Sequence, residues 1–515
     1  MVTFAFVKVV TAAQCRQLED YTLTHGQLSR LDLMERAAEA VAREVAELMA
    51  TRERLVVFAG HGGNGGDALA AARLVYQKLT CPVEVYLIRN ERKLSQECQA
   101  NKERLCRECP DVKMNEVVGQ FNMPEIGRGD VVLDGLFGCG LSRPLTGGYA
   151  MLARQLNRGE GTIVSIDVPS GLMTEDNSEN YRANIVRADV TLCIGALKPA
   201  FLMADNQSIL GRWKVLDIGL LTDECTLEGP GYQIVEATAV GRLLRKRDLF
   251  SNKGTFGHGL LIAGQWGMAG AAVLAARAAL KSGIGKVSVY TPQTNNDIMQ
   301  IAVPEAIVKH AGRDNFMGPA LILDAYSALA VGPGMGTQKD ASLAMIKYVN
   351  GSRIPVVIDA DGLNILADHK GWLYQLPANA VLTPHPREFE RLFGECHDSF
   401  RMLEEARQSA KEYGVYIVLK GHYTAICNPQ GDVLFNNTGN PGMATAGTGD
   451  ALTGVLLSLL AQGYPVGDAL QMGVYVHGLA GDIAAEEMGE EGMTASDLIA
   501  CIPRAFKRLH ELGAE

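Results

Sequence analysis

The sequence lacks several features that would place a protein in a class at once. Its 515 residues carry 48 lysines and arginines against 58 aspartates and glutamates, and a formal charge of −10 offers no basic surface for nucleic acid or an anionic membrane. No uninterrupted apolar run is long enough to cross a bilayer. These absences predict a protein with no nucleic-acid or membrane partner, and they leave local phosphate sites open.

Two further absences concern the cell compartment. The N-terminal stretch MVTFAFVKVVTAAQ has no basic region before its apolar residues and no small-residue cleavage pattern, so it does not look like a signal peptide. The 11 cysteines follow no disulfide framework, and the CxxC of Cys106 and Cys109 has no second ligand pair for zinc. We therefore expect a cytoplasmic protein with reduced thiols.

Familiar nucleotide-binding motifs are also missing. No GxxxxGK[ST] occurs, so there is no Walker loop. The segment 60–67, GHGGNGGD, follows an apolar strand and precedes a helix, but the dinucleotide-binding fingerprint is incomplete because no suitably placed acid for a ribose follows it. This disfavours a plain NAD dehydrogenase, while a strand, glycine loop and helix still favour a ligand site over a simple tight turn.

What the sequence does contain is a glycine-rich segment that ends in an acid. Residues 436–450, NNTGNPGMATAGTGD, include four glycines, whose backbone freedom lets successive N–H groups converge on one anion. The next residues, ALTGVLLSLLAQG, have helical length and apolar spacing, so Asp450 lies at a helix N-terminus that favours phosphate. The alternative is an ordinary turn with Asp450 as a helix cap.

The length predicts two large domains or three smaller ones. Apolar strands alternate with helices in both halves, which predicts α/β domains with helices on both faces of a parallel sheet. The pattern thins between residues 217 and 247, and we place the boundary between residues 225 and 226.

Polar residues follow several of the expected strands in the first half. Asp134 and Asp167 each end an apolar strand, so both should reach the sheet edge that holds the loop of Asn64. Asn64, Asp134 and the Ser170 hydroxyl are oxygen ligands of the kind that suits an alkali or alkaline-earth cation. Either acid could instead be a cap, and the sequence alone does not show that the three residues converge.

The order of these motifs resembles a known family. GHGGNGGD, VLDGLFGCGLSRP, SIDVPSG and ALKPA resemble the N-terminal domain of the bifunctional NAD(P)H-hydrate repair enzymes. NKGTFGHGLLIAG, GMAGAA, VGPGMG, DADGLN, TPHPREFERL, VLKG and TGNPGMATAGTGD resemble the dehydratase domain of the same family. The resemblance covers nearly the whole chain and implies a Rossmann-like three-layer αβα epimerase domain over 1–225 and a ribokinase-like αβα dehydratase domain over 226–515.

For the first domain, the resemblance implies an epimerase of hydrated NADH and NADPH (NADHX and NADPHX) that contains potassium. Asp167 is our candidate for the proton-transfer group, and Lys198 is either a phosphate contact or a solvated lysine. The implied potassium ligands are Asn64, Asp134 and Ser170. The implied substrate contacts are Gly63, Asn64, Gly65, Gly66, Asp67, Gly138, Cys139, Gly140, Leu141, Ser142, Arg143, Pro144 and Asp167.

For the second domain, the resemblance implies dehydration of the S hydrate with ADP and Mg²⁺, with Asp450 accepting the hydroxyl proton. His385 is either a substrate contact or a structural histidine, and Asp359 and Asp361 either orient water or magnesium or cap a helix. Lys420 either meets phosphate or extends from its strand into solvent. The implied hydrate site is Ala271, Gly334, His385 and Asp450, and the implied nucleotide site is Lys420, Gly421, His422, Tyr423, Thr424 and Gly449.

The chain departs from the family pattern at four positions. It has Gly63 for a usual Asn, Ala68 for Gly, Asn252 for His and Ala446 for Gly. ADP is inferred from the fused domain order rather than from a residue, and the family resemblance suggests a homo-oligomer. The alternatives are a ribokinase-type kinase for a vitamin precursor, which would release a stable phosphorylated product, and a first domain that only binds a nucleotide or a partner.

Overall fold

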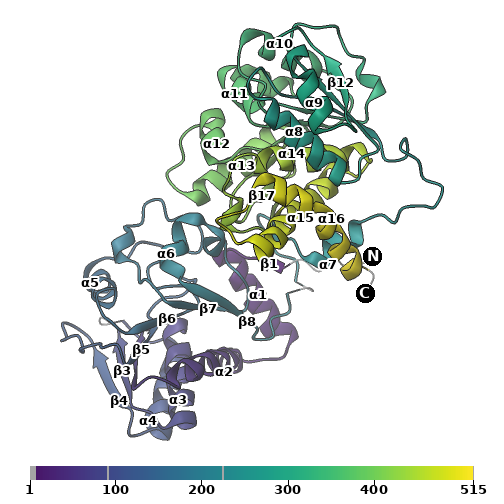
Figure 1. The fold of residues 1–515 in the computed structure, drawn as a ribbon. Helices are drawn as coiled ribbons and strands as arrows, with labels where there is room; N and C mark the ends of the chain where they lie inside the picture. The colour runs from purple at the N-terminus through teal and green to yellow at the C-terminus, as the bar shows by residue number, and fades with distance from the viewer. Residues whose placement is uncertain (1–6, 90–91, 223–224, 514–515) are drawn as a thin grey trace. The chain divides into compact units, whose positions relative to one another are not determined.

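The computed structural model describes residues 7–89, 92–222 and 225–513 (Figure 1). The chain forms two compact units. One comprises Lys8–Gly229 with Asp398–Arg401, and the other comprises Pro230–His397 and residues 402–513. The division between these units falls between Gly229 and Pro230, whereas we expected a domain boundary between residues 225 and 226.

The N-terminal unit is built on a seven-stranded sheet with the strand order β4-β3-β2-β5-β6-β7-β8. Every neighbouring pair in it is parallel. The central strands are apolar and buried because helices cover both of their faces. The strands are β2 (Arg54–Ala59), β3 (Val83–Ile88), β4 (Lys113–Val117), β5 (Asp130–Gly135), β6 (Thr162–Ile166), β7 (Val190–Ile194) and β8 (Arg212–Leu216).

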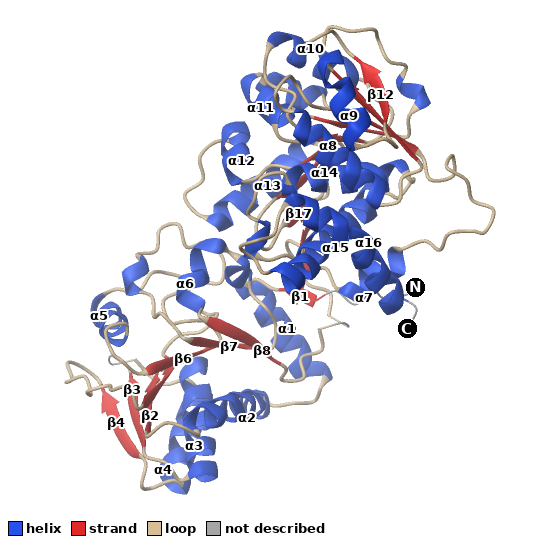
Figure 2. Cartoon of the chain, viewed as in Figure 1, coloured by secondary structure: helices blue, strands red, loops and turns tan. Residues whose placement is uncertain are grey.

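Helices form the outer layers of this unit. α2, α3 and α4 pack on one face of the sheet and α5 packs on the other, which gives three layers (Figure 2). A short strand, β1 (Val7–Val9), precedes α1, and Thr11 and Gln14 close the expected capping box at the start of α1. The helices are α1 (Ala12–His25), α2 (Arg30–Met49), α3 (Gly63–Leu79), α4 (Gln96–Glu108), α5 (Gly147–Leu156) and α6 (Gln207–Leu210).

The C-terminal unit has its own sheet, in which strands β9 to β18 follow the order β9-β18-β17-β16-β15-β14-β13-β10-β11-β12. Along this order, every neighbouring pair from β16 to β12 is parallel, including the pairs made by β10 and β11. In contrast, β17 pairs antiparallel with both β16 and β18. The alternating pattern did not predict this change of direction, which follows from connections too short for a crossover. The strands are β9 (Tyr232–Ile234), β10 (His258–Ile262), β11 (Lys286–Thr291), β12 (Ile307–His310), β13 (Ala328–Val331), β14 (Val356–Ile358), β15 (Val381–Leu382), β16 (Tyr416–Leu419), β17 (Ala425–Cys427) and β18 (Val433–Phe435).

The helix α14 (Thr448–Ala461) lies at the centre of this unit. Every residue from Ala451 to Ala461 is buried, and α14 packs against α8, α15 and the sheet. A helix that is apolar on all sides belongs in a core, and this one holds its N-terminus in a fixed place. The other helices are α7 (Ala237–Leu243), α8 (Ala269–Lys281), α9 (Asn296–Ala302), α10 (Lys339–Val349), α11 (Asp361–Asp368), α12 (Pro386–Phe393), α13 (Ser399–Tyr413), α15 (Val466–Met488) and α16 (Ala495–Gly513).

Among the residues that the structure describes, no helix combines the length and the apolar character needed to span a bilayer.

Candidate active sites

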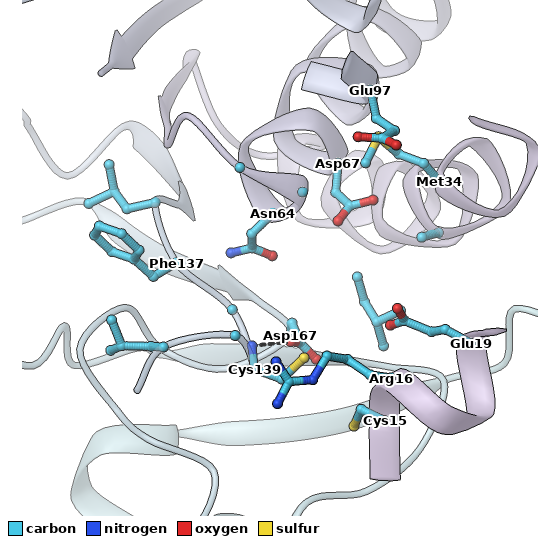
Figure 3. Close-up of a pocket in the computed structure, with 18 of the residues that line it drawn as sticks. Cys15, Arg16, Glu19, Met34, Asn64, Asp67, Glu97, Phe137, Cys139 and Asp167 are labelled. Atoms are coloured by element: carbon cyan, nitrogen blue, oxygen red, sulfur yellow. Dashed lines mark hydrogen bonds between the residues drawn. The ribbon is translucent and has the colours of Figure 1, made fainter. Parts of the chain in front are cut away.

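A cavity of about 810 Å³ opens at the carboxyl ends of the strands in the N-terminal unit (Figure 3). Loops after β2, β5 and β6 line it, together with residues of α1, α2 and α3. Eleven of the sequence-predicted residues line this cavity: Gly63, Asn64, Asp67, Gly138, Cys139, Gly140, Leu141, Ser142, Arg143, Pro144 and Asp167. The parallel sheet therefore brings distant motifs to one place, as a strand-end site requires.

Four predicted residues lie behind the wall of this cavity instead of lining it: Gly65, Gly66, Asp134 and Ser170. All four are buried. A Cβ at position 65 would lie 1.9 Å from the carbonyl oxygen of Gly60, so this glycine is needed for the close approach of the backbone. Gly65 thus lets the first turn of α3, which carries Asn64, pack against Gly60.

Asp167 projects from the end of β6 and is 6% exposed. Its φ of 68° is in the left-handed region, which is costly for a residue with a side chain and is often found at functional sites. One carboxyl oxygen accepts the Lys198 ammonium at 2.5 Å, and the other accepts the Cys139 backbone N–H at 2.7 Å. Burial raises the pKa of Asp167, but the Lys198 charge and these hydrogen bonds outweigh it and hold the pKa below its ordinary value.

Lys198 is only 1% exposed, so of its two alternatives the solvated lysine is wrong. Its ammonium donates to Asp167 and, at 2.8 Å, to the carbonyl of Ile194. Burial lowers the pKa of Lys198, yet the Asp167 carboxylate raises it further, and the net pKa is above the ordinary value. The sequence did not indicate this role, because nothing around Lys198 identifies Asp167, which lies 31 residues earlier in the chain, as its partner.

Asp134 lies beneath the cavity and is fully buried. It accepts hydrogen bonds from the Ser170 hydroxyl at 2.6 Å, the Ser170 N–H at 2.9 Å and the Ser165 hydroxyl at 2.8 Å. Burial raises the pKa of Asp134, and these hydrogen bonds lower it in part. Asn64 donates from its amide nitrogen to the Ile166 carbonyl at 3.3 Å, and among the described residues its Oδ1 accepts no hydrogen bond. The possible cation ligands of Asn64, Asp134 and Ser170 are all oxygen atoms, which an alkali cation prefers. In this structure the Asp134 carboxylate accepts hydrogen bonds from the hydroxyls of Ser165 and Ser170 instead.

In the C-terminal unit, the glycine-rich segment leads into α14 as the sequence predicts, and Asp450 lies in the first turn of that helix. Gly447 has a φ of 92°, and a Cβ there would lie 2.5 Å from Leu274 Cδ1. Asp482 of α15 accepts the Gly439 N–H at 3.0 Å and the Asn440 amide at 2.9 Å, which fixes the first turn of the segment. The loop is therefore held from both ends.

Asp450 is half-buried and sits among other acids. Its burial raises the pKa to about 7, with further increases from the negative charges of Asp359, Asp361 and Glu388 and a decrease from Lys420. A carboxylate with a pKa near neutrality can both take and release a proton at physiological pH, which is what a general base requires.

Lys420 is the cation of this site. Its ammonium donates to Asp359 at 2.9 Å and lies 3.8 Å from Glu388, and Asp359 also accepts the Thr453 hydroxyl at 2.6 Å. A Cβ built at Gly449 would be 3.4 Å from the Lys420 ammonium, so the glycine keeps this charge open to the helix N-terminus. The interpretation of Lys420 as a strand-end lysine in solvent does not fit this pairing.

The other predicted residues of this unit are held by contacts of their own. His385 caps α12, since its Nδ1 accepts the N–H groups of Arg387 and Glu388, and burial lowers its pKa. Asp361 accepts the Gly336 N–H at 2.8 Å. Gly334 and Ala271 lie against each other, the Ala271 methyl being 3.0 Å from a Cβ built at Gly334. At positions 421–424, Thr424 closes the turn on Gly421, and the rings of His422 and Tyr423 lie 4.5 Å apart.

Comparisons with known proteins match both halves of the chain. The family model described as NAD(P)H-hydrate dehydratase matches residues 259–504, and the one described as YjeF-related protein N-terminus matches residues 30–200. The bifunctional NAD(P)H-hydrate repair enzyme Nnr of Thermofilum pendens is 33% identical over 93% of this chain and 92% of its own. Its counterpart in Moorella thermoacetica is 32% identical over 98% of this chain and 97% of its own. This chain belongs to the family of bifunctional NAD(P)H-hydrate repair enzymes.

A solved structure agrees with the fold of the C-terminal unit. A ribokinase-like superfamily protein of Enterococcus faecalis is 26% identical, with a TM-score of 0.50, and covers 56% of this chain and 98% of its own. The family resemblance and the α/β fold class predicted from the sequence are both confirmed.

Several residues of this hydrate-repair chain were not found from its sequence. Glu388, Thr453 and Asp482 support the site around Asp450 from helices that gave only a helical pattern. Ala68, which departs from the family pattern, is buried, and a Cβ at Gly135 would lie 2.4 Å from its methyl group. Gly63 is exposed and has no atom within 4 Å of a built Cβ.

Proposed function

We propose that this chain repairs hydrated nicotinamide nucleotides in two reactions. The N-terminal unit interconverts the R and S epimers of NADHX and NADPHX, and the C-terminal unit dehydrates the S epimer at the expense of ADP. The observation that carries the second activity is Asp450, an acid with a pKa of about 7 in the first turn of a buried helix that follows a glycine-rich loop. Family membership supports both activities.

The dehydration follows from a simple difficulty, which is that hydroxide is a poor leaving group. The Asp450 carboxylate takes the proton of the hydrate's hydroxyl, and the oxygen attacks the terminal phosphorus of ADP, so that AMP leaves. The C–O bond of the phosphate ester then breaks, phosphate departs, and loss of a ring proton restores the dihydronicotinamide. The loop amides, the helix dipole and Lys420 stabilise negative charge on the transferred group.

Two ions enter this proposal with different support. Potassium in the N-terminal unit would be held by oxygens of Asn64, Asp134 and Ser170, and it would supply a fixed positive charge near the substrate. For Mg²⁺, the described residues include no cluster of three metal-ligating side chains, and Asp359 is paired with Lys420. We therefore propose Mg²⁺ only as the companion of the nucleotide phosphates and derive no step through it.

The test is to incubate the purified protein with a mixture of R and S NADH hydrate and with ADP or ATP, with and without K⁺ and Mg²⁺. Recovery of NADH absorbance and release of phosphate are both followed. Conversion of both epimers is expected. Conversion of the S epimer alone would refute the epimerase, and a stable phosphorylated product would refute the dehydratase in favour of a kinase.

A further inference from the structure

The cavity of the N-terminal unit is lined by four carboxyl groups from four different segments. Asp67 comes from α3, Glu19 from α1, Glu97 from α4 and Asp167 from the end of β6. Asp167 is paired with Lys198, whereas Asp67 has no hydrogen-bond or ion-pair partner among the residues that the structure describes. In Figure 3 the carboxyl groups of Asp67 and Asp167 point into the cavity from different sides, and the Asn64 amide is drawn between them.

The surroundings of these two acids favour opposite protonation states. Burial raises the pKa of Asp67 well above its ordinary value, and the negative charges of Asp167 and Glu19 raise it further. The residues that face Asp67 from α4 are Cys98 and Glu97, neither of which supplies a positive charge. Asp167 is kept ionised by Lys198. Of this pair, Asp67 thus presents an O–H donor and Asp167 a carboxylate to whatever binds between them.

The substrate needs this combination. Hydration of a dihydronicotinamide adds water across an enamine, and the hydroxyl is expected on the ring carbon next to the ring nitrogen. The lone pair of that nitrogen can expel the hydroxyl as water if an acid protonates the hydroxyl oxygen. Another water molecule can then add to the opposite face of the ring if a base accepts a proton from that water. An acid and a base on opposite sides of the ring therefore invert the carbon.

We propose that Asp67 is the general acid of the epimerase and that Asp167 is its base, an inference that rests on the proposed function of the N-terminal unit. Asp67 gives its proton to the hydroxyl, the C–O bond breaks, water leaves and the ring nitrogen forms an iminium bond. A water molecule then forms a new C–O bond on the other face and gives its proton to Asp167. One turnover moves one proton from Asp67 to Asp167, and either the reverse reaction or exchange with solvent restores the starting state.

The experiment uses the full chain with purified R or S hydrate and no added nucleotide, so that only epimerisation is measured, by chromatographic separation of the epimers. Asp67→Asn keeps the shape of the side chain and removes the acid. We expect the epimerisation rate to fall by about 10²- to 10⁴-fold. The dissociation constant for the hydrate should change less than threefold, and dehydration of the S epimer with ADP should be retained. The matched control is Asp20→Asn, the same change at an exposed acid of α1 outside the cavity, which should keep the wild-type rate.

Isotope labelling tests the same proposal on the wild-type protein, so the conclusion does not depend on the folding of a variant. Epimerisation in H₂¹⁸O should place one solvent oxygen in the product for each inversion. Retention of the original oxygen would overturn the proposal, because it would mean that the C–N bond opens instead. A rate within threefold of wild type for Asp67→Asn would also overturn the proposed role of Asp67. If Asp167→Asn is inactive in the same assay, the proposed epimerase activity itself still stands. If the wild-type chain fails to interconvert the epimers, the proposed function itself is wrong.

Discussion

The proposed role of Asp450 as a base predicts effects on catalysis and on stability that one substitution can separate. Its pKa of about 7 in the folded protein compares with an ordinary value of 3.8. If the ionised form is the base, only about one tenth of the molecules are active at pH 6 and about nine tenths at pH 8. The dehydration rate at saturating S hydrate should therefore rise about tenfold between these two pH values, with a midpoint near 7.

The raised pKa of Asp450 also predicts a lower free energy of unfolding at high pH. Below pH 3.8 Asp450 is protonated in both the folded and the unfolded protein and contributes nothing. Above pH 7 it is ionised in both, and the folded state bears the unfavourable burial of that charge. A shift of about 3 pH units corresponds to at most about 4 kcal/mol, and partial exposure of the side chain reduces it. Asp450→Asn should thus abolish most dehydration while raising the free energy of unfolding at pH 8 and not at pH 4.

The assay is the NADH absorbance produced from S hydrate between pH 5.5 and 8.5, together with the denaturation of the wild type and of Asp450→Asn at pH 4 and 8. The matched control is Asp468→Asn, which changes an acid of α15 whose pKa burial also raises. It should leave the midpoint of the rate profile at about 7. A flat rate profile, or an Asp450→Asn variant with near-normal turnover, would remove Asp450 from the role of base.

Four other substitutions test the two sites. Lys420→Met should move the midpoint of the dehydration profile above 7, because Lys420 lowers the pKa of Asp450, and unpairing the buried Asp359 should cost about 3–5 kcal/mol in denaturation. Lys198→Met should cost a similar amount and stop epimerisation, while the double variant with Asp167→Asn should regain stability without activity. Gly447→Ala should weaken nucleotide binding in calorimetry, because its φ of 92° costs about 1–3 kcal/mol with a side chain, whereas Ala446→Gly at the exposed neighbour should not. Gly63→Asn should leave the melting temperature unchanged, because nothing lies within 4 Å of the new Cβ, and a lower one would contradict the open space seen there.

The features that could be predicted from the sequence are those that a local residue pattern determines. Glycines before an apolar run predicted the loop and helix around Asp450, and strand-end acids predicted that Asp167 would reach the sheet edge. Asp134 also ends its strand, yet it lies beneath the cavity, because its direction depends on hydrogen bonds with Ser165 and Ser170 that no local pattern specifies.

Ion pairs between distant segments were the part that the sequence did not predict. Lys198 and Lys420 each meet an aspartate from another strand end, and that pairing depends on strand order and register rather than on spacing. The short connections around β17 reversed the direction of that strand for a similar reason, since helix and strand periodicity say nothing about which way a strand runs.

The two candidate sites draw on separate parts of the chain. The residues that line the cavity of the N-terminal unit all lie between Cys15 and Leu220, and the acids and the lysine around Asp450 all lie after Pro230. A gene divided at the codons for Gly229 and Pro230 would therefore cut through neither constellation. A substitution within either constellation therefore alters no residue of the other.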